Sequence, residues 1–307
     1  MTKDLRIVFL GTPDFASTTL QKLVENDVNV VAVITAPDKP KGRGKKVATS
    51  AVKDCALLHG LPVLQPTNLK SPTFLEELAS YKADLQIVVA FRMLPIAVWD
   101  MPPMGTFNLH ASLLPQYRGA APINWAIMNG EKETGVTTFF LQHEIDTGAI
   151  VYQESEPILP SDDVGSLYER LMHKGATLVL KTVQAIEQGK FPQLAQDETQ
   201  ELKKAPKIFK EDCKINWERP AEEVRNFIRG LSPYPAAWTV LEGKTLKIFK
   251  VEVTESLGSR PGHFSVQNKN ELFVDCEDHQ LRIHELQLEG KRRMTAEEFL
   301  RGYSLSS

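Results

Sequence analysis

The chain has 307 residues, of which 42% are hydrophobic and 24% are charged, so it can bury a sizeable core and has the composition of an ordinary globular protein. Its formal net charge of −3 at pH 7 excludes a protein that is cationic throughout, and leaves only a local basic patch for binding nucleic acid. The three isolated cysteines have no metal-ligand spacing, and the apolar run near the N-terminus is too short for a signal peptide or a membrane span. We therefore expect a cytoplasmic protein without disulfides, a metal site or membrane contact.

Strands and helices alternate in the first half of the chain. The patterns predict strands at 5–10, 28–35, 61–66, 83–91 and 106–111, and helices from Phe15 to Leu23, at 51–60 and at 71–81, the last with Ser71 as N-cap. This alternation predicts a parallel, doubly wound α/β sheet. Ligands of such sheets bind outside the carboxyl ends of the strands.

The second half has a different pattern. Strands are expected at 135–143 and 150–158, followed by a long amphipathic helix at 166–189. Residues 190–207 are polar and without periodicity, which is typical of a linker. A helix at 221–231 and several short strands then suggest a small β-barrel or sandwich. We therefore expect one domain at 1–189 and a second at 208–307.

Polar side chains occur at the end of one predicted strand. In the run TFNLH, Asn108 and His110 point to one face of the sheet while Phe107 and Leu109 point to the other. A histidine can move protons near neutral pH, an asparagine amide can donate to an oxyanion, and a carboxylate such as Asp146 can orient the imidazole. The set suits acyl transfer to an amine, but from the spacing alone the interpretation that we favour is a capping Asn, a core His and a turn Asp.

Two neighbouring segments carry weaker signals. Ser112, Leu113, Leu114 and Pro115 are a strand exit that ends at a proline, and they could also offer backbone groups and apolar side chains to a flat heteroaromatic ligand. The GTPDF turn after the first strand lacks the GxGxxG pattern, so it favours a plain turn over a dinucleotide site.

Residues 37–46 form a basic segment rich in glycine and proline, which predicts a mobile loop. Its cations are Lys39, Lys41, Arg43, Lys45 and Lys46. Charge runs of this kind usually form a solvated surface, but this one follows the second predicted strand, on the same edge of the sheet as the candidate site. Contact with a polyanion is therefore the alternative that we favour.

The order and spacing of these motifs resemble the 10-formyltetrahydrofolate-dependent formyltransferase family. The resemblance rests on Asn108–x–His110 with SLLPQYRGAAPINWAI directly after it, and on Asp146–Thr147–Gly148. GTPDFA, the basic segment with the following SAVK, and INWERPAEEVRNFIRGLSPYPAAWT are similar to the members that formylate methionyl-tRNA.

The resemblance implies a Rossmann-like catalytic domain and an OB-like C-terminal domain that helps to hold the tRNA. It implies that Asn108, His110 and Asp146 are catalytic, that Ser112 to Pro115 contact the folate, and that the basic segment engages the tRNA, with Arg43 the critical residue. It also implies a role in translation initiation, with 10-formyltetrahydrofolate and methionyl initiator tRNA as substrates. We expect a monomer.

The sequence departs from the family pattern in two places. Phe91–Arg92 stands where a Tyr–Gly pair is usual, and His143–Glu144–Ile145 precedes Asp146 where Asp–Gly or Glu–Gly–Leu is common. The C-terminal domain is not basic either, because residues 208–307 hold 15 Lys and Arg against 16 Asp and Glu. Binding of RNA there requires that the basic side chains gather on one face.

Two alternatives to tRNA formylation are kept. The acceptor could be an amino-sugar nucleotide, glycinamide ribonucleotide or water, but none of these needs a basic segment and a C-terminal β domain. The chain could also be an RNA-binding module on an inactive scaffold, which the complete set of Asn108, His110 and Asp146 argues against.

Overall fold

The computed structural model describes residues 5–41 and 46–304, which divide into two compact units. Unit 1 consists of Met1–Arg118, Gly135–Glu156 and Glu169–Lys203. Unit 2 consists of Gly119–Thr134, Pro157–Tyr168 and Lys204–Ser307. In the part of the chain that is described, no helix is both long and apolar enough to cross a membrane.

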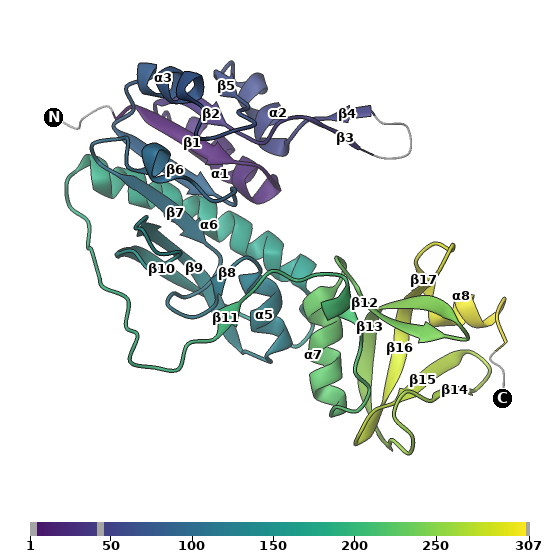
Figure 1. Cartoon of the computed structure of the whole chain (residues 1–307). Helices are drawn as coiled ribbons and strands as arrows, with labels where there is room; N and C mark the ends of the chain where they lie inside the picture. Colours follow the sequence, from purple (N-terminus) through teal and green to yellow (C-terminus); the bar gives the residue numbers. More distant parts are fainter. Residues whose placement is uncertain (1–4, 42–45, 305–307) are drawn as a thin grey trace. The chain divides into compact units, whose positions relative to one another are not determined.

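Unit 1 is built on a seven-stranded sheet in the order β10-β9-β7-β6-β1-β2-β5 (Figure 1). Its strands are β1 (Ile7–Gly11), β2 (Val30–Ile34), β5 (Val63–Leu64), β6 (Leu85–Val89), β7 (Thr106–His110), β9 (Glu133–Phe140) and β10 (Ile150–Pro157). The five strands from β7 to β5 pair in parallel, and β9 pairs antiparallel with β7. β1 and β6 are buried at every position, as continuous apolar runs in a parallel sheet should be.

Helices cover both faces of this sheet. They are α1 (Asp14–Val24), α2 (Ala51–Leu58), α3 (Pro72–Ser80), α4 (Ile96–Trp99) and most of α6 (Val164–Glu187). Val8 and Val88 pack on one face with Phe74 of α3 and Val98 of α4. On the other face α6 approaches β7 so closely that a β-carbon at Gly175 would lie 2.8 Å from Leu109. The predicted doubly wound, mostly parallel α/β sheet is confirmed.

The ends of the basic segment form strands, which corrects the prediction of a loop. β3 (Lys39–Lys41) pairs antiparallel with β4 (Lys46–Ala48), so the segment is a two-stranded hairpin that projects beside α2 (Figure 1). Each strand has only three residues, too few for a strand period to show in the sequence. Residues 42–45, which include Arg43 and Lys45, lie outside the described residues.

Two short helices were also missed by the sequence patterns. α4 has only four residues, and α5 (Pro122–Met128) has seven and begins with a proline in its first turn. Segments of this length are too short to show a helical period.

Unit 2 combines α5 with α7 (Ala221–Leu231) and an antiparallel sheet. Its further elements are β11 (Lys204–Ala205), a 3₁₀ turn at Glu211–Cys213, β12 (Ala237–Leu241), β13 (Lys244–Leu257), β14 (Phe264–Gln267), β15 (Glu271–Asp275), β16 (His279–Leu288), β17 (Met294–Thr295) and α8 (Ala296–Leu300). The strands pair in the path β12-β13-β16-β15-β14, with β17 beside β16. Val224 and Ile228 of α7 share one core with strand residues such as Ile248 and Ile283. The predicted C-terminal β domain is confirmed, and its closure into an OB-like barrel stays a prediction.

Candidate active site

β7 places Asn108 and His110 on one face of the sheet, as the strand period predicts. Val88 of β6 stands in register with Asn108, so both side chains share the face that α3 and α4 cover. Leu109 points the other way, toward α6. His110 is the last residue of β7 and therefore lies at the carboxyl end of a parallel strand.

The hydrogen bond of His110 decides which of its ring nitrogens can react. The imidazole is buried, with 6% of the residue exposed, and its Nε2 lies 2.8 Å from the carbonyl oxygen of Tyr117. A carbonyl only accepts, so Nε2 must carry a proton and donate it. In the neutral ring, Nδ1 is then the basic atom.

Asp146 faces that basic nitrogen. A carboxylate oxygen of Asp146 lies 3.9 Å from Nδ1 of His110, beyond a direct hydrogen bond but close enough to stabilise an imidazolium. Asp146 lies in the turn between β9 and β10 and has a φ of 57°, the left-handed region that residues other than glycine rarely adopt.

The two residues after Asp146 explain the Asp-Thr-Gly sequence. The Thr147 hydroxyl donates to the carbonyl of Glu144, 3.1 Å away, and closes the turn. A β-carbon at Gly148 would lie 1.6 Å from the carbonyl oxygen of Phe140, so only glycine fits there.

Asn108 is half-buried next to this pair. Within residues 5–41 and 46–304, its side-chain amide has no hydrogen-bond partner. An amide N–H that no protein group uses can donate to a negative oxygen on a bound reactant.

The segment Ser112 to Pro115 is held in place by its polar groups. The Ser112 hydroxyl is fully buried and donates to the carbonyl of Gln116, and the Ser112 carbonyl accepts from Thr137. Gln153 donates to the Leu114 carbonyl at 2.8 Å, and Leu114 itself is buried. Leu113 and Pro115 stay half-buried, so they are the side chains of the segment that remain open to a ligand.

The basic hairpin is anchored at its base by a polar cluster. Asp38 precedes β3 and accepts from the Lys53 ammonium at 2.5 Å and from the Gln65 amide at 2.7 Å. These hydrogen bonds, that from Lys53 foremost, lower the pKa of the Asp38 carboxyl, which therefore stays ionised. Lys39 is exposed.

The two departures from the family pattern have structural roles. The Arg92 guanidinium donates to the carbonyls of Pro66 and Thr67 and ties the loop after β6 to the segment after β5. The His143 ring meets the Trp99 ring of α4 edge to face, with centroids 5.6 Å apart, and so supports the turn that carries Asp146.

Gln196 was missed by the sequence analysis. It lies in the predicted linker, yet its amide donates to the backbone carbonyls of Asp146 and Gly148. Residues 193–200 are exposed apart from Gln196, which is half-buried. No periodicity or motif marks a single contact of this kind, so the sequence held no signal for it.

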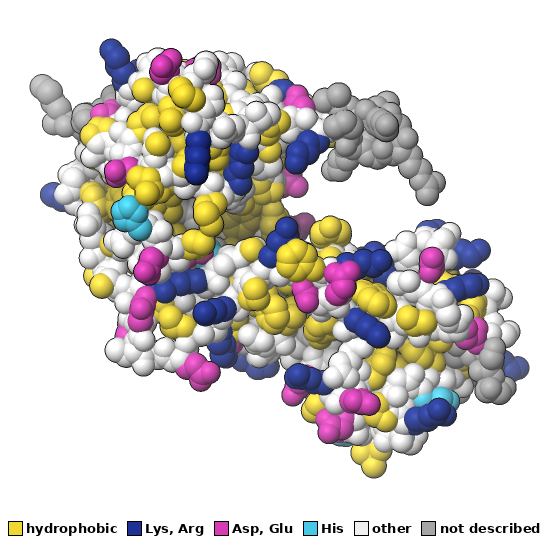
Figure 2. Space-filling model, in the orientation of Figure 1, with side chains coloured by type: hydrophobic (Ala, Val, Ile, Leu, Met, Phe, Trp, Pro, Cys, Tyr) yellow, Lys and Arg dark blue, Asp and Glu magenta, His cyan; other side chains and the backbone are white. Residues whose placement is uncertain are grey.

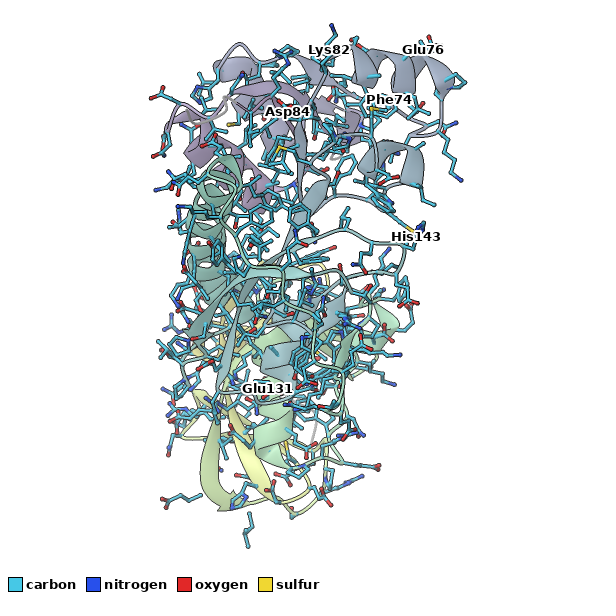
Figure 3. The ribbon with its side chains drawn as sticks, turned by 90° about the vertical axis from the view of Figure 1, so that its left-hand side faces the viewer. Phe74, Glu76, Lys82, Asp84, Glu131 and His143 are labelled. Carbon is cyan, nitrogen blue, oxygen red and sulfur yellow. The ribbon has the colours of Figure 1, made fainter. Side chains whose placement is uncertain are left out.

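A hollow of about 340 Å³ lies at the opposite edge of the sheet, among α3 and the residues that precede β6 and β7. Figure 3 shows Lys82 and Asp84 of this region at the top of the view and His143 further down. The Asp84 carboxylate accepts from the backbone N–H of Arg6, so it serves the fold. In the described part of the chain, no three His, Cys, Asp or Glu side chains are grouped to hold a metal.

Two family models match the chain and between them cover most of it. Residues 5–183 match the model described as formyl transferase, and residues 207–304 match the model described as formyl transferase, C-terminal domain.

Curated relatives and solved structures are similar to this chain along nearly all of its length. A methionyl-tRNA formyltransferase of Bacteroides fragilis is 54% identical, over 99% of this chain and 97% of the relative. Another of Flavobacterium johnsoniae is 49% identical, over 98% and 97%. The structure of an N-formyltransferase from Helicobacter canadensis in complex with folinic acid and dTDP-3-aminofucose has a TM-score of 0.67 at 21% identity, over 94% of this chain and 100% of that one, and so shares the fold. With its motifs, its fold and both of these models in agreement, the chain belongs to the formyl transferase family.

Proposed function

We propose that the protein transfers the formyl group of 10-formyltetrahydrofolate to the amino group of methionyl initiator tRNA. The observation that carries this proposal is the identity of 54% and 49% to relatives named methionyl-tRNA formyltransferase, along nearly the full length of both chains. Formylated methionyl-tRNA would serve translation initiation.

The geometry at β7 suits the chemistry of this transfer. Nδ1 of His110 accepts the proton that the attacking amine loses, and the Asp146 carboxylate stabilises the resulting imidazolium. The same ring then returns the proton to the nitrogen that the formyl group leaves. The Asn108 amide donates to the carbonyl oxygen of the formyl group as negative charge develops on it.

We place the folate against the segment from Ser112 to Pro115. The segment directly follows β7, and its half-buried Leu113 and Pro115 offer apolar contact to a flat ring. Folate supplies the formyl group, and these residues would hold its ring so that the formyl carbon meets Asn108 and His110.

We assign the tRNA contacts to the basic hairpin and to residues 208–307. Lys39, Lys41, Arg43, Lys45 and Lys46 would neutralise phosphates near the acceptor end. On the face of unit 2 seen in Figure 2, basic and acidic side chains are intermixed, so that face offers no purely basic surface. We propose a catalytic domain at 1–189, a linker at 190–207 and a tRNA-binding domain at 208–307, in a monomer that works in the cytoplasm.

The choice of acceptor is the test of the function. The protein is incubated with 10-formyltetrahydrofolate and, separately, with methionyl initiator tRNA, glycinamide ribonucleotide and an amino-sugar nucleotide. We expect formylation of the methionyl-tRNA, and none of methionyl-tRNA whose amino group is acetylated. Formylation of a small acceptor in place of the tRNA would overturn the proposal.

A further inference from the structure

The predicted linker makes specific contacts with the turn that carries Asp146. Leu194 pairs with Ile150 at the start of β10 through two backbone hydrogen bonds of 2.8 and 2.9 Å. Two residues later, the Gln196 amide nitrogen donates to the carbonyl of Asp146 at 2.8 Å and to that of Gly148 at 2.9 Å. Gln196 lies between the two matched family models, which end at 183 and resume at 207.

Arg118 fixes the orientation of this amide. Its Nε and Nη2 donate to the Gln196 oxygen at 3.0 and 2.6 Å. A guanidinium can only donate and a carbonyl can only accept, so the amide nitrogen must face the Asp146 turn. Every strong hydrogen-bonding group of the Gln196 side chain is thereby used.

These contacts connect the two sides of the His110 ring. Nε2 of His110 donates to the carbonyl of Tyr117, and Arg118 is the next residue along the chain. Arg118 holds Gln196, Gln196 holds the backbone of Asp146, and the Asp146 carboxylate faces Nδ1 of His110. Hydrogen bonds, together with the peptide bond between Tyr117 and Arg118, thus connect Nε2 of His110 to the backbone of Asp146, whose carboxylate faces Nδ1.

Asp146 needs such support because of its backbone. Few residues other than glycine adopt a φ of 57°, and the two hydrogen bonds from Gln196 hold the carbonyls of Asp146 and Gly148 in this conformation. A small rotation there would carry the carboxylate away from the imidazole, and its interaction with His110 falls with distance.

We propose that Gln196, oriented by Arg118, is a positioning residue that keeps the Asp146 carboxylate opposite His110 during formyl transfer. The inference rests on the proposed function, because it assigns Asp146 and His110 to that reaction. It adds the predicted linker to the machinery of the catalytic domain.

Steady-state formylation of methionyl initiator tRNA by Gln196→Ala tests the proposal. We expect kcat to fall about 10- to 100-fold, the loss typical of a residue that orients a reacting group, with the KM values for folate and tRNA unchanged. Gln196→Glu should lose as much, since its carboxylate keeps Arg118 but cannot donate to the two carbonyls. Gln196→Glu therefore tests the proposal even if Gln196→Ala does not fold.

Two controls separate positioning from a structural effect. Thr199→Ala removes a hydrogen bond within the same stretch, from the Thr199 hydroxyl to Asp197, without touching Asp146, so kcat should stay within about twofold of wild type. In an Asp146→Asn background, Gln196→Ala should cost almost nothing further, because the carboxylate that it positions is already gone.

Three results would overturn the proposal: wild-type kcat in Gln196→Ala, an equal loss in Thr199→Ala, or the same loss with and without the Asp146 carboxylate. Failure of the proposed function looks different. In that case the wild-type protein does not formylate the tRNA at all, and the Gln196 comparison is made with the acceptor that it does formylate.

Discussion

At the scale of single residues, His110 has one nitrogen engaged and one left to react. The Tyr117 carbonyl accepts the hydrogen bond from Nε2, and Nδ1 then faces Asp146. A histidine fixed in this way cannot exchange the roles of its two nitrogens without breaking a buried hydrogen bond. The reacting atom of the site is therefore set by backbone geometry as much as by the side chain.

Asn108→Ala should lower kcat about 100- to 1,000-fold, the usual cost of removing one donor to an oxyanion. Asn108 is half-buried and its amide bonds to no described residue, so the variant should unfold at the same temperature as wild type. Rapid-quench kinetics and thermal denaturation check the two parts. A loss confined to the KM for tRNA would show that Asn108 acts only in binding.

The cysteines should be inert in the folded protein. Cys55, Cys213 and Cys276 are free and buried, and burial raises the pKa of each thiol, that of Cys276 to about 12. Each thiol is thus protonated, and unreactive, at neutral pH, and thiolate appears only as the pH rises toward the raised pKa. Native protein at pH 8 should react slowly with a thiol reagent and denatured protein at once. Rapid labelling of native Cys276 would contradict the described burial.

At the scale of elements, the turn from β9 to β10 depends on the close approach of Gly148 to the Phe140 carbonyl. Gly148→Ala forces a β-carbon against the Phe140 carbonyl, which should destabilise the protein by about 1–3 kcal/mol and lower formylation as the Asp146 turn shifts. Gly302→Ala is the matched control, because a β-carbon there meets nothing within 4 Å. Chemical denaturation measures both. Equal stability of the two variants would contradict the geometry.

If the basic hairpin contacts tRNA phosphates, it should make the affinity for tRNA fall as the salt concentration rises. Each phosphate contact that is lost flattens the slope of log affinity against log salt by a little under one unit. Lys39→Ala together with Lys41→Ala should flatten it by up to about two units and leave folate affinity unchanged. Lys70→Ala, an exposed lysine outside the hairpin, should leave the slope as it is. An unchanged slope in the double variant would make the hairpin a solvated charge run.

Strong periodicity predicted the elements that carry the site. The buried runs gave β1, β2, β6 and β7, and the alternation in TFNLH placed Asn108 and His110 on one face. Periodicity could not predict the hairpin of β3 and β4, whose strands have three residues each, or the short α4 and α5.

At the scale of the whole chain, contacts between residues far apart in sequence were the hardest to predict. Asp146 reaches His110 across 36 positions (146 − 110), and the spacing alone favoured a plain turn aspartate, whereas the structure brings its carboxylate to 3.9 Å from Nδ1 of His110. Gln196 reaches Asp146 from a stretch without any pattern. Such contacts follow from how the sheet brings its strand ends together, which local sequence does not encode.

The central claim is that the site at the carboxyl end of β7, with His110, performs formyl transfer. Its most direct test is single-turnover formylation of methionyl initiator tRNA by His110→Ala. Folate affinity is measured on the same protein as the control for folding. We predict a rate about 100- to 10,000-fold below wild type with folate affinity retained, because the variant lacks the group that moves the proton. Formylation at the wild-type rate by a folded, folate-binding His110→Ala protein would contradict the account.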